Sequence, residues 1–172
     1  MNRAVLLLVL LAAPVARATR VERASLESLV AGAGLVVLGH PLARTAFWDG
    51  GRILTRVTLA VDETWAGTPP AAGTLDVVLL GGIVGDLGQT VSGEARIPDA
   101  GLVVAALQQV EGRWRVLGMS QGLFEVRAER PGPPTVVRRL DGLAWLEDTA
   151  PAAFPERLDA LRQRVMDLAN AR

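Results

Sequence analysis

The sequence contains no cysteine, no lysine and no tyrosine, and it has a single histidine, His40. Without cysteine there is no disulfide and no thiolate ligand, so an apolar core must hold the fold. A zinc site built around one histidine would need carboxylates gathered from scattered loops. A phosphate-binding P-loop requires Gly-Lys-Ser/Thr, which a chain without lysine cannot supply. We therefore predict neither a metal site nor a cofactor.

An excess of charge of either sign is also lacking. The 18 arginines balance 18 acidic residues, so the formal net charge is zero at neutral pH. A near-neutral chain carries no electrostatic signature for nucleic acid or for acidic membranes. Half of the residues are apolar, which is enough for a sizeable core. These numbers favour a globular protein that does not bind nucleic acid.

A run of ten apolar residues, positions 4–13, follows Arg3. The run is followed by Ala16 and Ala18, which place small residues at the two positions that a signal peptidase reads. A transmembrane helix needs about 20 apolar residues, so this run is too short to be one. We predict a signal peptide over residues 1–18, cleaved after Ala18, and a secreted or periplasmic mature protein without a membrane span.

Residues 19–172 are predicted to form one domain. Apolar residues at helical spacing predict helices over 22–31 and 155–170, the second with Pro155 in its first turn. The clearest strand is 52–65, where Ile53, Val57, Leu59, Val61 and Trp65 are expected to share one face. The predicted strands are 35–39, 52–65, 75–80, 101–109, 113–119, 123–129 and 135–140, with 40–51 expected as a loop.

Seven short strands with helices only at the two ends do not fit alternating strand–helix–strand units. They favour a mainly β fold instead. We predict a small closed or partly open β-barrel of the OB (oligonucleotide/oligosaccharide-binding) type, with a short N-terminal helix and a C-terminal α-helix.

The stretch LLGGIVGDLGQTVSGEARIP, residues 79–98, places glycines at three-residue intervals after a predicted strand. The spacing is not the G-x-G-x-x-G of dinucleotide-binding sites, and no helix follows whose N-terminus could meet a phosphate. We interpret it as a long connection between two barrel strands, with glycines where the backbone bends or packs closely. Asp86, Glu94 and Asp99 are solvated loop acids or, alternatively, weak calcium ligands.

Residues 118–122, GMSQG, match the G-x-S-x-G pattern of the nucleophilic serine in α/β-hydrolases. In those enzymes a helix follows the serine, and the acid and histidine come later in the chain. Here a strand is predicted next, and the histidine comes first. A triad of His40, Asp62 and Ser120 is formally allowed, because triads are recognised by geometry. We expect a turn or a bulge, and keep a small serine hydrolase using Ser120 as an alternative.

Three aromatic residues are candidates for protein binding. Phe47 and Trp48 lie in the predicted loop, and Trp65 ends the long predicted strand. Exposed aromatic side chains can anchor a protein partner. The alternative is that all three cover the ends of the barrel.

The order of several segments resembles a group of uncharacterised exported bacterial proteins. The matching segments are a T-x-V-T-x-x-V strand, the GG-x-x-G-x-x-G stretch and a later Gln-Gly-x-Phe, within about residues 33–128. The resemblance implies an architecture similar to the OB-type barrels of netrin and TIMP (tissue inhibitor of metalloproteases) modules. TIMPs chelate a protease zinc through an N-terminal cysteine, which this chain lacks, so that mechanism is not implied. No site residue is implied either.

Together, these features lead us to expect an exported, non-catalytic protein-binding module that modulates or accompanies a secreted peptidase. Phe47, Trp48 and Trp65 are its candidate binding residues. A small hydrolase is one alternative, and a structural envelope protein without a discrete ligand is another.

Overall fold

The computed structural model describes residues 20–128, 131–146 and 156–172. The predicted signal peptide therefore lies outside the described residues. The strands are β1 (Arg20–Val21), β2 (Leu35–Asp49), β3 (Arg52–Ala66), β4 (Thr74–Leu80), β5 (Gly82–Val84), β6 (Leu87–Gln89), β7 (Val103–Val110), β8 (Arg113–Val116), β9 (Leu123–Arg127), β10 (Thr135–Val137), β11 (Ala144–Trp145) and β12 (Glu156–Arg157). The helices are α1 (Leu26–Gly32), α2 (Leu158–Asn170) and the short 3-10 helix η1 (Met119–Gly122).

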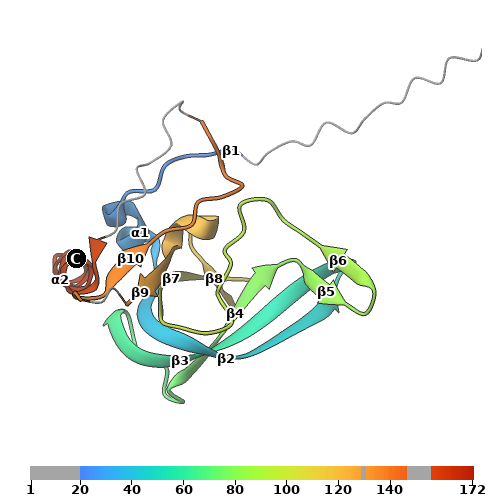
Figure 1. Ribbon diagram of the computed structural model, residues 1–172, viewed down its shortest axis with the longest axis horizontal. Helices are drawn as coiled ribbons and strands as arrows, with labels where there is room; N and C mark the ends of the chain where they lie inside the picture. The colour runs from blue at the N-terminus through green and yellow to red at the C-terminus, as the bar shows by residue number, and fades with distance from the viewer. Residues whose placement is uncertain (1–19, 129–130, 147–155) are drawn as a thin grey trace, which may run out of the picture.

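Five strands close into a ring in the order β2, β3, β4, β8, β7 and back to β2 (Figure 1). All neighbours in the ring are antiparallel except β4 and β8, which pair in parallel at Val77 and Trp114. Strands β9, β10 and β12 extend the sheet from the other side of β7. The expected mainly β, small barrel-like fold with a helix near each end is confirmed, and its five-stranded ring is the arrangement expected of the OB type.

The first four residues of β2 are buried on both faces. Leu35 and Val37 belong to the core inside the ring, whereas Val36 and Leu38 belong to a second core beneath the helices. Successive side chains of a strand point to opposite faces, so one apolar run serves both cores. Each such buried side chain contributes about 1.5–3 kcal/mol relative to exposure. This short run therefore contributes side chains to both hydrophobic cores.

Strand β3 was predicted almost to the residue, but its side chains do not all share one face. Val57 and Leu59 lie in the ring core, whereas Trp65 lies in the outer core. The register between β2 and β3 shifts at Leu38/Gly39 and again at Val36/Val37. An extra residue at such a bulge reverses which face the following side chains occupy. The prediction that Trp65 shares the face of Val57 is therefore wrong.

The expectation of a loop over residues 40–51 is also wrong. Strand β2 continues to Asp49, which pairs with Arg52, and only Gly50 and Gly51 form the turn. Both glycines have positive φ, as a two-residue hairpin turn of this kind requires. Pairing along the whole of β3 makes this segment a strand despite Pro41, which is tolerated because β7 pairs with β2 only as far as Gly39.

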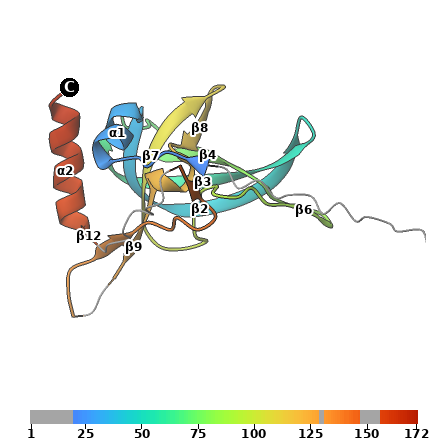
Figure 2. The ribbon, with the colours of Figure 1, turned by 90° about the horizontal axis from the view of Figure 1, so that it is seen from above.

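The glycine-rich stretch contains a short hairpin that the sequence did not reveal. Strands β5 and β6 pair with each other and lie at the far end of the molecule from α2 (Figures 1 and 2). A Cβ added to Gly82 would come within 2.4 Å of Thr55 Oγ1, so only glycine allows β5 to approach β3 this closely. The Gln89 side chain then accepts a hydrogen bond from the backbone N–H of Ile53 at 2.7 Å.

Helices α1 and α2 lie side by side on the outside of the ring (Figure 2). Leu161 and Val165 of α2 are buried against this outer core, as the predicted apolar stripe required. Helix α1 begins at Leu26, later than predicted, because the Ser25 hydroxyl caps it by accepting from the Ser28 N–H. Pro155, expected in the first turn of α2, lies outside the described residues.

Candidate functional site

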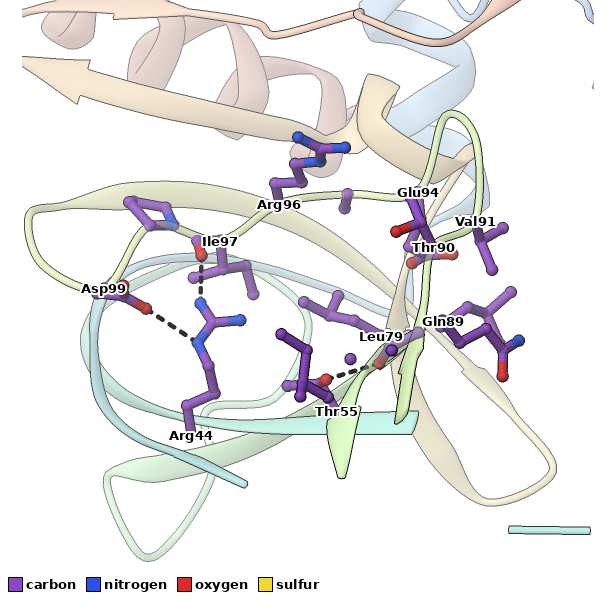
Figure 3. Close-up of a pocket in the computed structure, with 17 residues that line it drawn as sticks. Arg44, Thr55, Leu79, Gln89, Thr90, Val91, Glu94, Arg96, Ile97 and Asp99 are labelled. Atoms are coloured by element: carbon purple, nitrogen blue, oxygen red, sulfur yellow. Dashed lines mark hydrogen bonds and ion pairs between the residues drawn. The ribbon is translucent and has the colours of Figure 1, made fainter. Parts of the chain in front are cut away.

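A cleft of about 710 Å³ opens between the inner face of the curved β2–β3 hairpin and the chain that returns from β6 toward β7 (Figure 3). Arg44 comes from β2, Thr55 from β3 and Leu79 from β4, while residues 88–91 and 94–99 form the opposite wall. Clefts of this size are typical of ligand sites. The glycine-rich stretch that was expected to be only a connection therefore forms much of a cavity wall.

We call residues 94–98 the crossing segment, because they run across the ring opening. Ala95 and Ile97 are buried in the ring core, while Arg96 between them is exposed. From β2, the Arg44 guanidinium donates to the Ile97 carbonyl oxygen and to Asp99 Oδ1, the latter at 3.0 Å. Figure 3 shows Arg44 reaching across the hollow to this segment. The crossing segment is thus held by apolar contacts with the ring core and, at its end, by the hydrogen bonds of Arg44.

Glu94 is the buried carboxylate of the cleft, with 8% of its side chain exposed. Its nearest cation, Arg115 of β8, lies 3.6 Å away. Burial raises the pKa of Glu94, and the Arg115 charge together with the backbone amides of Leu80 and Ala95 offsets this only in part. A buried, incompletely neutralised acid facing a cleft is a feature common at functional sites.

A smaller cavity of about 180 Å³ lies on the other side of the crossing segment. Glu94 and Arg96 line it as well, facing Glu125 and Arg139, which form an ion pair at 2.7 Å. Glu94 therefore stands at the boundary between two cavities. Sequence reasoning treated Glu94 as a solvated loop acid; the alternation of Ala95 and Ile97 was the available signal that this segment is buried.

The three aromatic candidates do not form one surface. Trp65 is buried, with 5% exposure, and its indole N–H donates to Glu63, so it is not available as a surface anchor. Phe47 is partly buried, with the Arg56 guanidinium 5.3 Å from its ring centre, beside a cavity of about 270 Å³. Trp48, its neighbour on the strand, faces the other way and is half exposed. Of the three, only Trp48 presents a large exposed apolar surface.

The proposed triad residues are only partly brought together. His40 Nδ1 and Asp62 Oδ2 are 2.9 Å apart. Ser120, however, is buried in η1, and its hydroxyl has no hydrogen-bond partner within the described parts of the chain. The expected turn or bulge around Ser120 is in fact this short 3-10 helix. Its neighbour Gln121 is structural: the side chain accepts from Ala24 N–H at 2.7 Å and donates to the Glu22 carbonyl.

Metal ligands are not gathered either. Within residues 20–128, 131–146 and 156–172, no three His, Cys, Asp or Glu side chains cluster closely enough to hold an ion. Of the three acids weighed for calcium, Glu94 and Asp99 line the large cleft while Asp86 does not. Asp99 is already paired with Arg44.

No helix in the described portion is long and apolar enough to cross a membrane. Comparison of the chain with protein families, with curated proteins and with solved structures gave no match.

Proposed function

We propose that the protein is an exported protein-binding module without catalytic activity of its own. Its binding surface is the open end of the large cleft, where the β5–β6 hairpin meets the distal half of β2. This proposal keeps Trp48 as the anchor and sets aside Trp65, which is buried.

The observation that carries the proposal is a group of exposed apolar side chains at this end. Trp48 is 50% exposed, Ile83 73% and Leu87 61%. Ile83 lines the cleft, and Gly82 beside it packs on Ala46, two residues before Trp48 on the same face of β2. Exposed aromatic and aliphatic side chains next to a polar cavity are typical of protein-binding sites.

A secreted peptidase is our proposed partner, by analogy with the TIMP modules, whose OB-type barrel the sequence resemblance implies for this chain. Such an analogy supports an interaction without naming its residues. The proposal predicts that the protein is recovered from the exported fraction with its N-terminus at Thr19, in a stoichiometric complex. Mass spectrometry of the intact protein and of co-purifying chains measures both.

The matched test compares two substitutions of exposed apolar residues. Trp48→Ala should weaken the complex at least about tenfold, as expected for an interface anchor. Leu146→Ala, which removes a side chain of similar exposure directly after β11, should leave affinity unchanged. Circular dichroism checks that both variants remain folded. Recovery of the protein alone, or equal binding by wild type and Trp48→Ala, would contradict the proposal.

The two alternatives make different predictions. A serine hydrolase using Ser120 would be labelled by a fluorophosphonate probe in the folded state and would lose the label in Ser120→Ala. A structural envelope protein would tolerate substitutions throughout residues 40–51 without loss of any partner.

A further inference from the structure

We propose that the large cleft receives an arginine side chain of the bound protein, with Glu94 as the carboxylate that pairs with its guanidinium. This inference rests on the proposed function, because it names the chemistry of the partner group that enters the cleft. It is carried by the position of Glu94 and by the pairing of Arg44 with Asp99 in the cleft wall.

Two arginines line the cleft. Arg44 donates to Asp99 and to the Ile97 carbonyl, so its charge is balanced within the wall. Arg96 also lines the cleft, and Figure 3 shows its guanidinium on the opposite side of the crossing segment from Arg44. The guanidinium that reaches across the hollow is therefore already paired.

Unlike the Arg44 guanidinium, the Glu94 carboxylate is not fully paired. Glu94 Oε2 and Arg115 Nη2 are 3.6 Å apart, so they form an ion pair but are too far apart for a hydrogen bond. A carboxylate has about four acceptor positions, so room remains for a donor beyond the nearby backbone amides. Its raised pKa agrees with incomplete neutralisation, since burial outweighs the compensating groups. A second cation would relieve this cost of a buried charge.

Arginine fits this position better than lysine. The guanidinium is planar, remains charged when partly buried and can donate two parallel hydrogen bonds to one carboxylate. The cleft, at about 710 Å³, is large enough to admit such a side chain together with part of its backbone. The exposed Ile83 at its edge would lie against the aliphatic stem, as apolar surface commonly does for arginine.

The test uses two nearly isosteric probes: citrulline has a carbonyl oxygen in place of one terminal nitrogen of arginine, which removes the positive charge. Nα-acetyl-arginine amide and Nα-acetyl-citrulline amide are titrated into the ¹⁵N-labelled protein, and amide shifts are followed at Gly81, Gly82 and Thr90 of the cleft wall. We expect saturable shifts there with the arginine probe and at least about tenfold weaker binding of citrulline. Equal binding of the two probes, or no response of these amides, would overturn the inference.

Two variants locate the carboxylate. Glu94→Gln should lose the preference for arginine, whereas Glu125→Gln, which removes an acid from the smaller cavity only, should keep it. A preference lost in Glu125→Gln but kept in Glu94→Gln would place the site in the smaller cavity and contradict the inference. If Glu94→Gln does not fold, the comparison of the arginine and citrulline probes on the wild-type protein still tests whether the cleft prefers arginine. Failure here leaves the Trp48-dependent complex as a separate test of the proposed function.

Discussion

Burial of the Glu94 carboxylate carries an energetic cost, and we propose that the same residue binds an arginine of the partner. Taking a carboxylate out of water is unfavourable unless its charge is fully compensated. The Arg115 guanidinium is close but does not reach hydrogen-bond distance. A glutamine of nearly the same shape would avoid the charge altogether. The buried charge therefore does not act chiefly to stabilise the fold, which agrees with the proposed binding role.

This leads to a prediction about the pH dependence of stability. The folded pKa of Glu94 is raised above 4.5, so as pH rises past that value the unfolded chain releases its proton first. The free energy of unfolding then falls with pH until the folded carboxyl has ionised as well. Glu94→Gln removes this loss, so its stability relative to wild type should increase with pH across that window and then level off.

Urea unfolding of both proteins between pH 4 and pH 8 measures the difference directly. Arg115 is partly exposed in the wild type, so water can solvate it after the substitution. A stability difference that is constant over this range would show that folding does not raise the pKa of Glu94, and one that favours wild type increasingly as pH rises would show that Glu94 is stabilised as an anion.

At the scale of elements, the sequence predicts the strands and helices whose apolar pattern extends over many consecutive residues. Strand β3 alternates over fourteen predicted positions and was found almost to the residue, and α2 shows a clear apolar stripe. The second half of β2 was missed because Pro41 and small polar residues resemble a loop. It is a strand because β3 pairs with it, and pairing is not a local property.

The elements that form the candidate site were the least predictable. Strands β5 and β6 have three residues each, too few to show alternation. Glu94 is buried because the crossing segment packs on the ring core, where Arg44 from another strand donates to the Ile97 carbonyl oxygen. Trp48 was expected to be exposed and is half exposed, although it lies in a strand rather than a loop. Trp65 was predicted on the wrong face because the register shift at Leu38/Gly39 places an extra residue, Asp62, before it.

Helix α2 gives an element-scale prediction. Leu161 is fully buried between α2 and the outer core, so Leu161→Ala should lower the free energy of unfolding by about 2–5 kcal/mol. Leu168→Ala, at a partly buried position on the same helix, should cost clearly less. Equilibrium denaturation followed by tryptophan fluorescence measures both, because Trp65 belongs to the same core. Equal costs would mean that α2 does not dock through Leu161.

At the scale of the whole molecule, two cores share one set of strands. Strands β2 and β7 contribute side chains both to the ring core and to the core beneath the helices. The proposed binding end lies at the opposite side of the molecule from α2 (Figure 1). The core beneath the helices and the β5–β6 hairpin are therefore spatially separate, and we expect the hairpin to open locally at a lower cost than global unfolding.

This separation predicts an order of amide hydrogen exchange. The amides of Val37, Val104 and Ala105 should be the slowest, because these residues are at most 1% exposed and lie in paired strands at the shared centre. The amides of the β5–β6 hairpin should exchange much faster, since Ile83 and Leu87 are largely exposed and only three residues pair on each side. Exchange measured by mass spectrometry with peptide resolution, or by NMR, distinguishes the two groups. Hairpin protection equal to that of the centre would mean that the binding end opens only when the whole molecule unfolds.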